Sequence, residues 1–200
     1  MMIEEFLIAF FLTDLGSQWI DNLYSIPNVP LSFPDEIESR QKFRKPILFI
    51  AMISAVELLP NLDSILAMFF LTLITLTDFE QQVILDRMTI PFAMIGVIRI
   101  FYFQLDWLDY FLAAGIGGLI FLILAFLTHG AIGGGDIKLI AILGIWFGSE
   151  ILSLIVPFGI ILAGISAGIM LLTGLKSRKD YFAYAPYFTI MAIYFLIHGI

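Results

Sequence analysis

Two aspartates beside long apolar segments are the residues of this sequence best suited to chemistry. Asp136 follows a run of three glycines, 133–135, and leads into an apolar segment. Asp78 directly follows another apolar segment, near 64–77. An ionisable residue at the end of a membrane segment is costly to keep there and is a functional candidate by default. Because glycines lack a Cβ atom, the run lets another backbone approach closely or lets the chain open locally into an extended form.

Two carboxylates at the same membrane depth on different helices can meet across a helical bundle. Like charges a few ångströms apart do not both ionise readily, so such a pair shares one proton. The carboxylate can then take a proton from water while the carboxylic acid polarises a scissile carbonyl, which is the chemistry of aspartyl proteolysis. Asp78 and Asp136 are therefore a candidate catalytic pair, provided that the fold brings them together.

The composition places these aspartates in a membrane protein. The 200 residues are 60% hydrophobic and 14% charged, and the mean hydropathy is +1.01, whereas a soluble domain is about half apolar and a quarter charged. The net charge of −7 argues against a nucleic-acid partner, because a phosphate-binding surface is basic. The chain has no cysteine, and His129 and His198 lack the spacing of metal ligands, so the sequence predicts no metal site.

The apolar segments predict an all-α fold, a polytopic bundle of transmembrane helices surrounded by membrane lipid. A crossing needs about 20 mostly apolar residues, or fewer in a short or polar-capped span. In the first segment Asp14 and Asp21 lie seven residues apart, so they share a helix face that would look into the bundle or a wet cavity. The eight predicted helices lie near residues 4–24, 46–59, 64–77, 89–104, 108–128, 137–148, 151–173 and 184–199.

The basic residues predict the orientation, because they accumulate in short cytoplasmic loops. With both termini outside, nine of the ten basic residues lie in cytoplasmic connections, and only Arg99 lies within a span, where it would pair with an acid that the sequence does not identify. Asp78 and Asp136 then lie at the cytoplasmic face of the membrane. The nine residues are Arg40, Lys42, Arg44, Lys45, Arg87, Lys138, Lys176, Arg178 and Lys179.

Three motifs of the chain resemble those of a known family, the type IV prepilin peptidases, also called leader peptidases, of the GxGD class of membrane aspartyl proteases. The segment that begins Gly133-Gly134-Gly135-Asp136-Ile137-Lys138-Leu139 resembles the family's second catalytic segment. Residues 77–91 resemble the first, including the eight-residue spacing between Asp78 and Asp86. Residues 183–187 resemble a proline-containing motif near the family's carboxyl end.

The resemblance implies that Asp78 and Asp136 are the catalytic pair, that cleavage needs no cofactor, and that the protein lies in a prokaryotic inner membrane. The implied substrate is a pilin, pseudopilin or competence precursor of a type IV pilus or type II secretion system, cut after its short basic leader. Glu80 and Asp86 are expected to be solvated interfacial acids or contacts for the leader. Lys138 is expected to hold Asp136 ionised or to reach a lipid phosphate. The glycines Gly133, Gly134 and Gly135 are expected to admit the substrate backbone.

The amino-terminal part differs from the family pattern. Many bacterial members carry paired CxxC zinc motifs in a cytoplasmic loop, associated with methylating the new amino terminus from S-adenosylmethionine. Here loop 25–46 is short and has no cysteine, so residues 1–75 are interpreted as a reduced form of that region and residues 76–200 as the aspartyl peptidase core. Three alternatives stay open: a peptidase that is also an N-methyltransferase using S-adenosylmethionine, a proton-coupled transporter using the same aspartates, and a catalytically silent assembly factor. A homo-oligomer also stays open.

Overall fold

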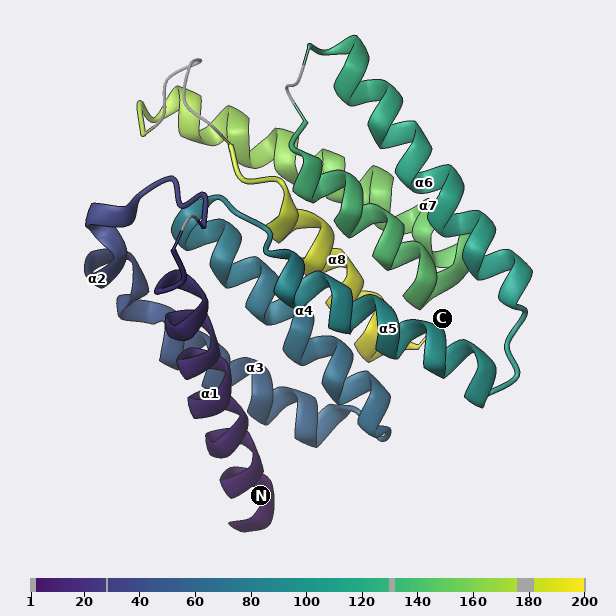
Figure 1. Ribbon diagram of the computed structural model, residues 1–200, viewed down its shortest axis with the longest axis horizontal. Coiled ribbons are helices and arrows are strands. Elements are labelled where there is room, and N and C mark those ends of the chain that lie inside the picture. The colour runs from purple at the N-terminus through teal and green to yellow at the C-terminus, as the bar shows by residue number, and fades with distance from the viewer. Residues whose placement is uncertain (1–2, 28, 130–131, 176–181, 200) are drawn as a thin grey trace.

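A computed structural model describes residues 3–27, 29–129, 132–175 and 182–199, and the regular elements within these ranges are all helical (Figure 1). The all-α prediction is therefore confirmed for the described part of the chain. Lys176, Arg178 and Lys179, which helped to predict the orientation, lie outside the described residues. The helices are α1 (Ile3–Tyr24), α2 (Ile37–Arg40), α3 (Arg44–Leu58), α4 (Leu62–Gln81), α5 (Asp86–Tyr102), α6 (Trp107–Leu127), α7 (Gly134–Leu172) and α8 (Ala185–His198).

The predicted count of eight transmembrane helices is not confirmed. Because α2 is a single turn of 4 residues, the described ranges hold 7 longer helices. The predicted segments 137–148 and 151–173 both lie in α7, which has 39 residues. Among the described helices, α4, α6 and α7 are long and apolar enough to cross a membrane, and α8 is a shorter apolar helix.

A bend at Gly148 explains why two predicted segments lie in one helix. Gly148 has φ 70° and ψ −177°, which is outside the helical region and is essentially restricted to glycine. The ribbon of α7 changes direction at this bend (Figure 1). The Asp109 carboxylate of α6 accepts a hydrogen bond from the Ser149 backbone N–H at 3.0 Å. A Cβ atom on Gly148 would lie only 2.6 Å from that carboxylate, so the bend needs both the glycine conformation and the glycine size.

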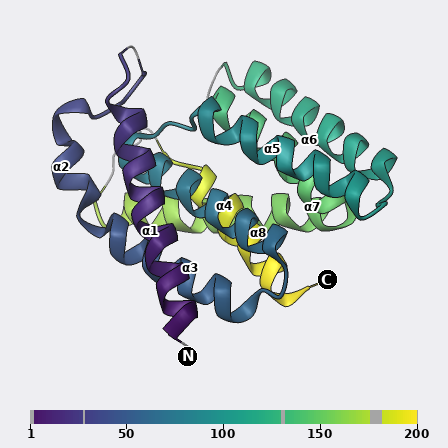
Figure 2. The same cartoon turned by 60° about the horizontal axis from the view of Figure 1, so that its bottom comes forward.

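The helices form a bundle in which α1, α2 and α3 lie on one side and α6 lies on the opposite side. Helix α1 packs against α3, while α6 packs against α7. Figures 1 and 2 show α4, α5 and α8 between these two groups. Helix α4 packs against α3, α5 and α8. The end of α4 can therefore receive contacts from both the amino-terminal and the carboxyl-terminal parts of the chain.

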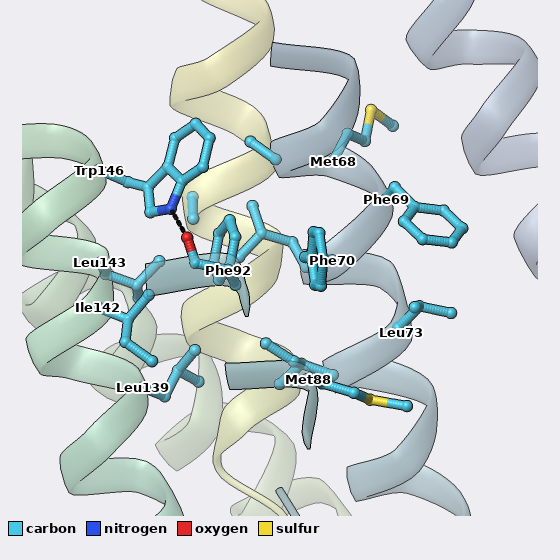
Figure 3. Close-up of a cluster of buried hydrophobic side chains, with 14 of the residues drawn as sticks. Met68, Phe69, Phe70, Leu73, Met88, Phe92, Leu139, Ile142, Leu143 and Trp146 are labelled. Carbon is cyan, nitrogen blue, oxygen red and sulfur yellow. Dashed lines mark hydrogen bonds between the residues drawn. The ribbon is translucent and has the colours of Figure 1, made fainter. Parts of the chain in front are cut away.

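An aromatic stack joins α4, α5 and α7 in the core (Figure 3). Phe92 stacks on Phe70 with a centroid distance of 5.4 Å and on Trp146 with a centroid distance of 4.9 Å. The Trp146 Nε1–H donates a hydrogen bond to the Phe92 carbonyl oxygen at 2.9 Å. Gly96 makes room for this indole, because a Cβ atom there would lie 2.8 Å from Trp146 Nε1. Since lipid tails are as apolar as the core, this dispersion and hydrogen bonding hold the helices together more than water exclusion does.

Three ion pairs located by the structure bear on predictions from single residues. Arg99 of α5 binds Asp63 of α4, with Nε 2.8 Å from Oδ2, which confirms that Arg99 pairs with an acid. Asp14 and Asp21 of α1 both face the start of α3, where Asp14 binds Lys45 at 3.2 Å and Asp21 binds Arg44. Both aspartates are about half exposed. They therefore lie at the surface beside α3 and not inside the bundle.

Candidate active site

Asp78 lies in the last turn of α4, where the apolar run of that helix ends. Asp78 is 6% exposed, so neighbouring elements bury it. The helix stops because Gln82 adopts a left-handed conformation, with φ 51° and ψ 41°. The Gln82 backbone N–H then donates to the Asp78 carbonyl oxygen at 3.0 Å. This is a left-handed helix cap, and it holds the backbone of Asp78 in the final turn.

Asp136 lies in the first turn of α7, directly after the glycine run. Gly133 has the extended conformation of a residue that precedes a helix, with φ −70° and ψ 147°. Its carbonyl oxygen accepts a hydrogen bond from the Asp136 backbone N–H at 3.1 Å. The residue is partly exposed. The two aspartates thus occupy opposite kinds of helix terminus, the end of α4 and the start of α7.

The neighbours of the two aspartates bring the two segments together. Ile84, in the turn between α4 and α5, packs on Gly135, where a Cβ atom would lie 2.9 Å from the Ile84 Cβ. Lys138 of α7 binds Asp86 at the start of α5, with Nζ 2.6 Å from Oδ1. Both partners of that ion pair are more than half exposed, and such pairs contribute about 0–1 kcal/mol. The close approach at Gly135 therefore constrains the junction more strongly than the ion pair does.

We expect Gly135→Ala to lower kcat/KM of any activity at this site by about 10-fold or more. Overpacking costs about 1–3 kcal/mol, and about 1.4 kcal/mol corresponds to a factor of ten. The added methyl group would push Ile84 away and separate the segments that carry Asp78 and Asp136.

Gly115→Ala in α6 is the control, because nothing lies within 4 Å of a Cβ atom at Gly115 and the residue lies outside the aspartate segments. Steady-state rates of the two variants with the same substrate test the prediction. Equal rates for Gly135→Ala and Gly115→Ala would show that the contact with Ile84 does not constrain the site.

The third motif, residues 183–187, also lies at this end of the bundle. Ala183, Pro186 and Tyr187 line a cavity of about 160 Å³. Phe79 and Gln82, which follow Asp78 in the sequence, line the same cavity. Thr75 lies three residues before Asp78, and its hydroxyl is hydrogen-bonded to the Thr189 hydroxyl of α8 at 2.6 Å. The end of α4, the start of α7 and the start of α8 therefore gather in one region.

Two of the predicted supporting residues have different surroundings from those expected. Glu80 is 3% exposed and binds Arg44 through both carboxylate oxygens, at 2.8 Å and 2.6 Å. The expectation that Glu80 is a solvated acid is therefore wrong, because its carboxylate is buried against Arg44 of the amino-terminal part. Lys138 was expected to reach Asp136 or a lipid phosphate, and its ammonium instead binds Asp86. Asp86 is itself half exposed, as an interfacial acid would be.

Residues that sequence reasoning missed hold the end of α4 in place. Arg44 is 2% exposed, although in the sequence it is one of four basic residues between 40 and 45 and nothing distinguishes it from the others. Tyr24 and Gln81 are also buried, and both contact this region. Within the described residues, no group of three or more histidine, aspartate or glutamate side chains is arranged to hold a metal ion.

These features define an integral membrane protein, a bundle that contains helices long enough to cross a membrane. Its candidate acid–base site consists of two aspartates at helix ends, Asp78 and Asp136. A family model described as the type IV leader peptidase family matches residues 65–172. The chain belongs to the type IV leader peptidase family, and the resemblance found in the motifs is thereby confirmed. The match includes both Asp78 and Asp136.

Part of the chain is also similar to a curated bacterial protein. The chain is 28% identical over 130 residues to a protein of Bacillus subtilis (strain 168) named prepilin leader peptidase/N-methyltransferase. The alignment covers 64% of this chain and 52% of the relative, so the chain spans about half the length of the curated relative that it matches. No solved structure matches the chain.

Proposed function

We propose that this protein is a membrane aspartyl endopeptidase that removes the short basic leader of prepilin-like precursors. The observation that carries the proposal is the junction of the two aspartate segments, in which Gly135 packs on Ile84 and Lys138 binds Asp86. Family membership supports the same reaction class. The site lies at the ends of apolar helices, where a substrate with a basic leader and an apolar helix would place its cleavage point.

The proposed reaction uses Asp78 and Asp136 as a pair that shares one proton. The ionised carboxylate takes a proton from a water molecule as that water attacks the scissile carbonyl carbon. The protonated carboxyl donates a hydrogen bond to the carbonyl oxygen and stabilises the charge that develops there. The tetrahedral intermediate collapses as its C–N bond breaks, and the leaving amine takes the proton that the first carboxylate received from the water. These steps need no cofactor and no metal ion, and we propose a metal-independent mechanism on this basis.

We propose that the site faces the cytoplasm of a prokaryotic cell. Arg40, Lys42, Arg87 and Lys138 belong to connections or helix ends at the aspartate end of the bundle, and Lys138 and Asp86 are in contact there. The opposite end holds the Arg99–Asp63 pair and the Asp109–Ser149 contact. Since basic residues accumulate on the cytoplasmic side, this distribution supports cytoplasmic cleavage.

The experiment that tests the function is cleavage of a synthetic prepilin-like peptide by the purified protein. The peptide joins a short lysine- and arginine-containing leader to about 20 apolar residues, a length that spans a bilayer. The protein is produced in a host strain that lacks its own prepilin peptidase and is reconstituted in lipid. Mass spectrometry of the products is expected to show one defined cut at the boundary between the leader and the apolar segment.

Two controls sharpen this test. A peptide whose leader lysines and arginines are replaced by glutamine is expected to be cut more slowly, because it loses its attraction to the acidic protein. Adding S-adenosylmethionine tests the N-methyltransferase activity named for the relative, through a mass gain of one methyl group on the new amino terminus. If the reconstituted protein leaves the basic-leader peptide intact, the proposed function is wrong.

A further inference from the structure

One buried guanidinium joins three helices beside the turn that carries Asp78. Arg44, at the start of α3, donates from Nε to Glu80 Oε1 at 2.8 Å and from a terminal nitrogen to Glu80 Oε2 at 2.6 Å. Its other terminal nitrogen faces α1, where it binds Asp21 and lies 3.5 Å from the Ser17 carbonyl oxygen. The planar fork of arginine matches a carboxylate at two points, which fixes orientation as well as distance.

Glu80 receives a further hydrogen bond from the amino-terminal helix. The Tyr24 hydroxyl at the end of α1 donates to Glu80 Oε2 at 3.1 Å. The guanidinium of Arg44 lies 5.4 Å from the centre of the Tyr24 ring, within the range of a cation–π contact. Burial lowers the pKa of Arg44, but the hydrogen bonds and charges of Glu80 and Asp21 more than offset this, so its pKa is raised. The arginine therefore stays charged in its buried position.

The next residue of α4 is held by the loop that follows α1. Gln81 is 0% exposed, and its side-chain amide exchanges two hydrogen bonds with the backbone of Phe33, at 3.0 Å and 2.9 Å. The Gln81 carbonyl oxygen also accepts from the Ser32 N–H at 3.3 Å. The side chains of two consecutive residues in the last turn of α4 are thus bound by the amino-terminal part of the chain.

The contacts of Glu80 approach α4 from the side away from the Asp78 side chain. Successive residues of an α-helix are turned by about 100°, so Glu80 lies about 200° around the helix from Asp78. Arg44 can therefore set the rotation and depth of the last turn without touching the atoms that react. The Gln82 N–H, bound to the Asp78 carbonyl oxygen at 3.0 Å, transmits the same constraint along the backbone.

We propose that Arg44, with Glu80, Tyr24 and Gln81, positions Asp78 for catalysis. In this arrangement the amino-terminal helices are a scaffold for the peptidase site, whatever else that region does. The inference rests on the proposed function for its kinetic effect, but the mobility of the α4 turn can be measured without any activity. Arg44 is a positioning residue, because it acts on Asp78 through Glu80, which lies in the same last turn of α4.

The kinetic test compares the loss of two arginine–carboxylate pairs, one at each end of α4. Arg44→Lys keeps the positive charge but loses the two-point contact of the guanidinium with Glu80. Glu80→Gln is a milder change that keeps the size and shape of the Glu80 side chain. Both are expected to lower kcat for peptide cleavage by about 10²-fold while KM changes less than about threefold, because small misplacement of a reacting group can cost that much. The matched control is Asp63→Asn, which breaks the arginine–carboxylate pair at the other end of α4 and is expected to keep kcat within about twofold.

Thermal unfolding of the same variants separates positioning from loss of stability. If Asp63→Asn and Glu80→Gln lower Tm equally and also lower kcat equally, Arg44 and Glu80 act only through stability and the proposal is overturned. Wild-type kcat in Arg44→Lys would overturn it as well. In both cases cleavage by the wild-type protein keeps the proposed function intact.

A second readout does not depend on cleavage. The chain has no cysteine, so Phe79→Cys places a single spin label on the last turn of α4, where Phe79 is 60% exposed. Leu62→Cys, at a position 72% exposed at the start of α4, is the matched label. Adding Arg44→Lys is expected to raise the mobility of the label at position 79 and to leave the label at 62 unchanged. Equal mobility at position 79 with and without Arg44→Lys would overturn the proposal even if the wild type cleaves nothing.

Discussion

Asparagine in place of Asp78 or Asp136 is expected to lower kcat for leader cleavage by about 10³-fold or more. Each change keeps the shape of the side chain and removes its ability to transfer a proton, and a positioned proton-transfer group contributes about 10²–10⁴-fold. Because the two groups act as a unit, the double variant is expected to be about as slow as the slower single variant. Initial rates at saturating peptide, followed by mass spectrometry, measure this effect.

Asp106→Asn is the matched control for these substitutions. Asp106 is exposed and caps the start of α6 by accepting from the Leu108 N–H at 3.2 Å, a role that asparagine fills equally well. Its kcat is expected to equal that of the wild type. Cleavage that survives Asp78→Asn or Asp136→Asn would contradict the two-aspartate mechanism.

The same substitutions separate the proposed peptidase from the two other classes. In a proton-coupled transporter, asparagine at either position would change the coupling of transport to protons, because the relay would lose a titratable group. In a catalytically silent assembly factor, asparagine would leave function intact. Only a peptidase loses a defined proteolytic cut in both variants while a control aspartate remains replaceable.

Gly144→Ala is expected to destabilise the folded protein by about 3 kcal/mol or more, at the upper end of overpacking effects. Helix α7 crosses α6 at this glycine, and a Cβ atom there would lie 2.4 Å from the Ala114 backbone nitrogen and 2.6 Å from the Ala114 Cα. These are backbone atoms, so no side-chain rotation relieves the contact and the helices must separate. Small residues at such crossings are what allow membrane helices to pack closely.

Gly164→Ala, on the same helix, is the matched control for this prediction. Nothing lies within 4 Å of a Cβ atom at Gly164, and alanine is favoured over glycine in a helix by about 0.5–1 kcal/mol. Unfolding of the two variants by heat or denaturant in the same detergent is expected to show a clear loss for Gly144→Ala and none for Gly164→Ala. Comparable losses would mean that the crossing at Gly144 tolerates a methyl group.

The glycines show how far the sequence could predict packing. Gly144 and Gly148 have the same four-residue spacing as Gly164 and Gly168, and this spacing of small residues predicts close helix contacts for both pairs. In the described structure a Cβ atom at Gly144 would meet the Ala114 backbone, whereas nothing lies within 4 Å of one at Gly164 or Gly168. Spacing along one helix is the same in both cases, and only the position of the neighbouring helix distinguishes them.

The helices themselves were largely predictable because their signal is local. Long apolar runs predicted elements close to the observed α4, α5 and α6, since a membrane helix satisfies its own backbone hydrogen bonds. The number of helices was not predictable in the same way. The bend of α7 rests on the backbone angles of Gly148, whereas the sequence pattern around 148–150 resembled an ordinary turn between two spans.

The sequence by itself determined that this is an apolar helical protein with aspartates at two helix ends, and that its motifs resemble the leader peptidase family. Those features are carried by neighbouring residues, so they can be read without a fold. The tertiary structure decided which charges pair and which of them are buried. Glu80 pairs with Arg44 in the interior, Arg99 pairs with Asp63 in a partly buried position, and Lys138 pairs with Asp86 at the surface. Each pair joins residues on different helices, and a charge is buried only where packing supplies its partner.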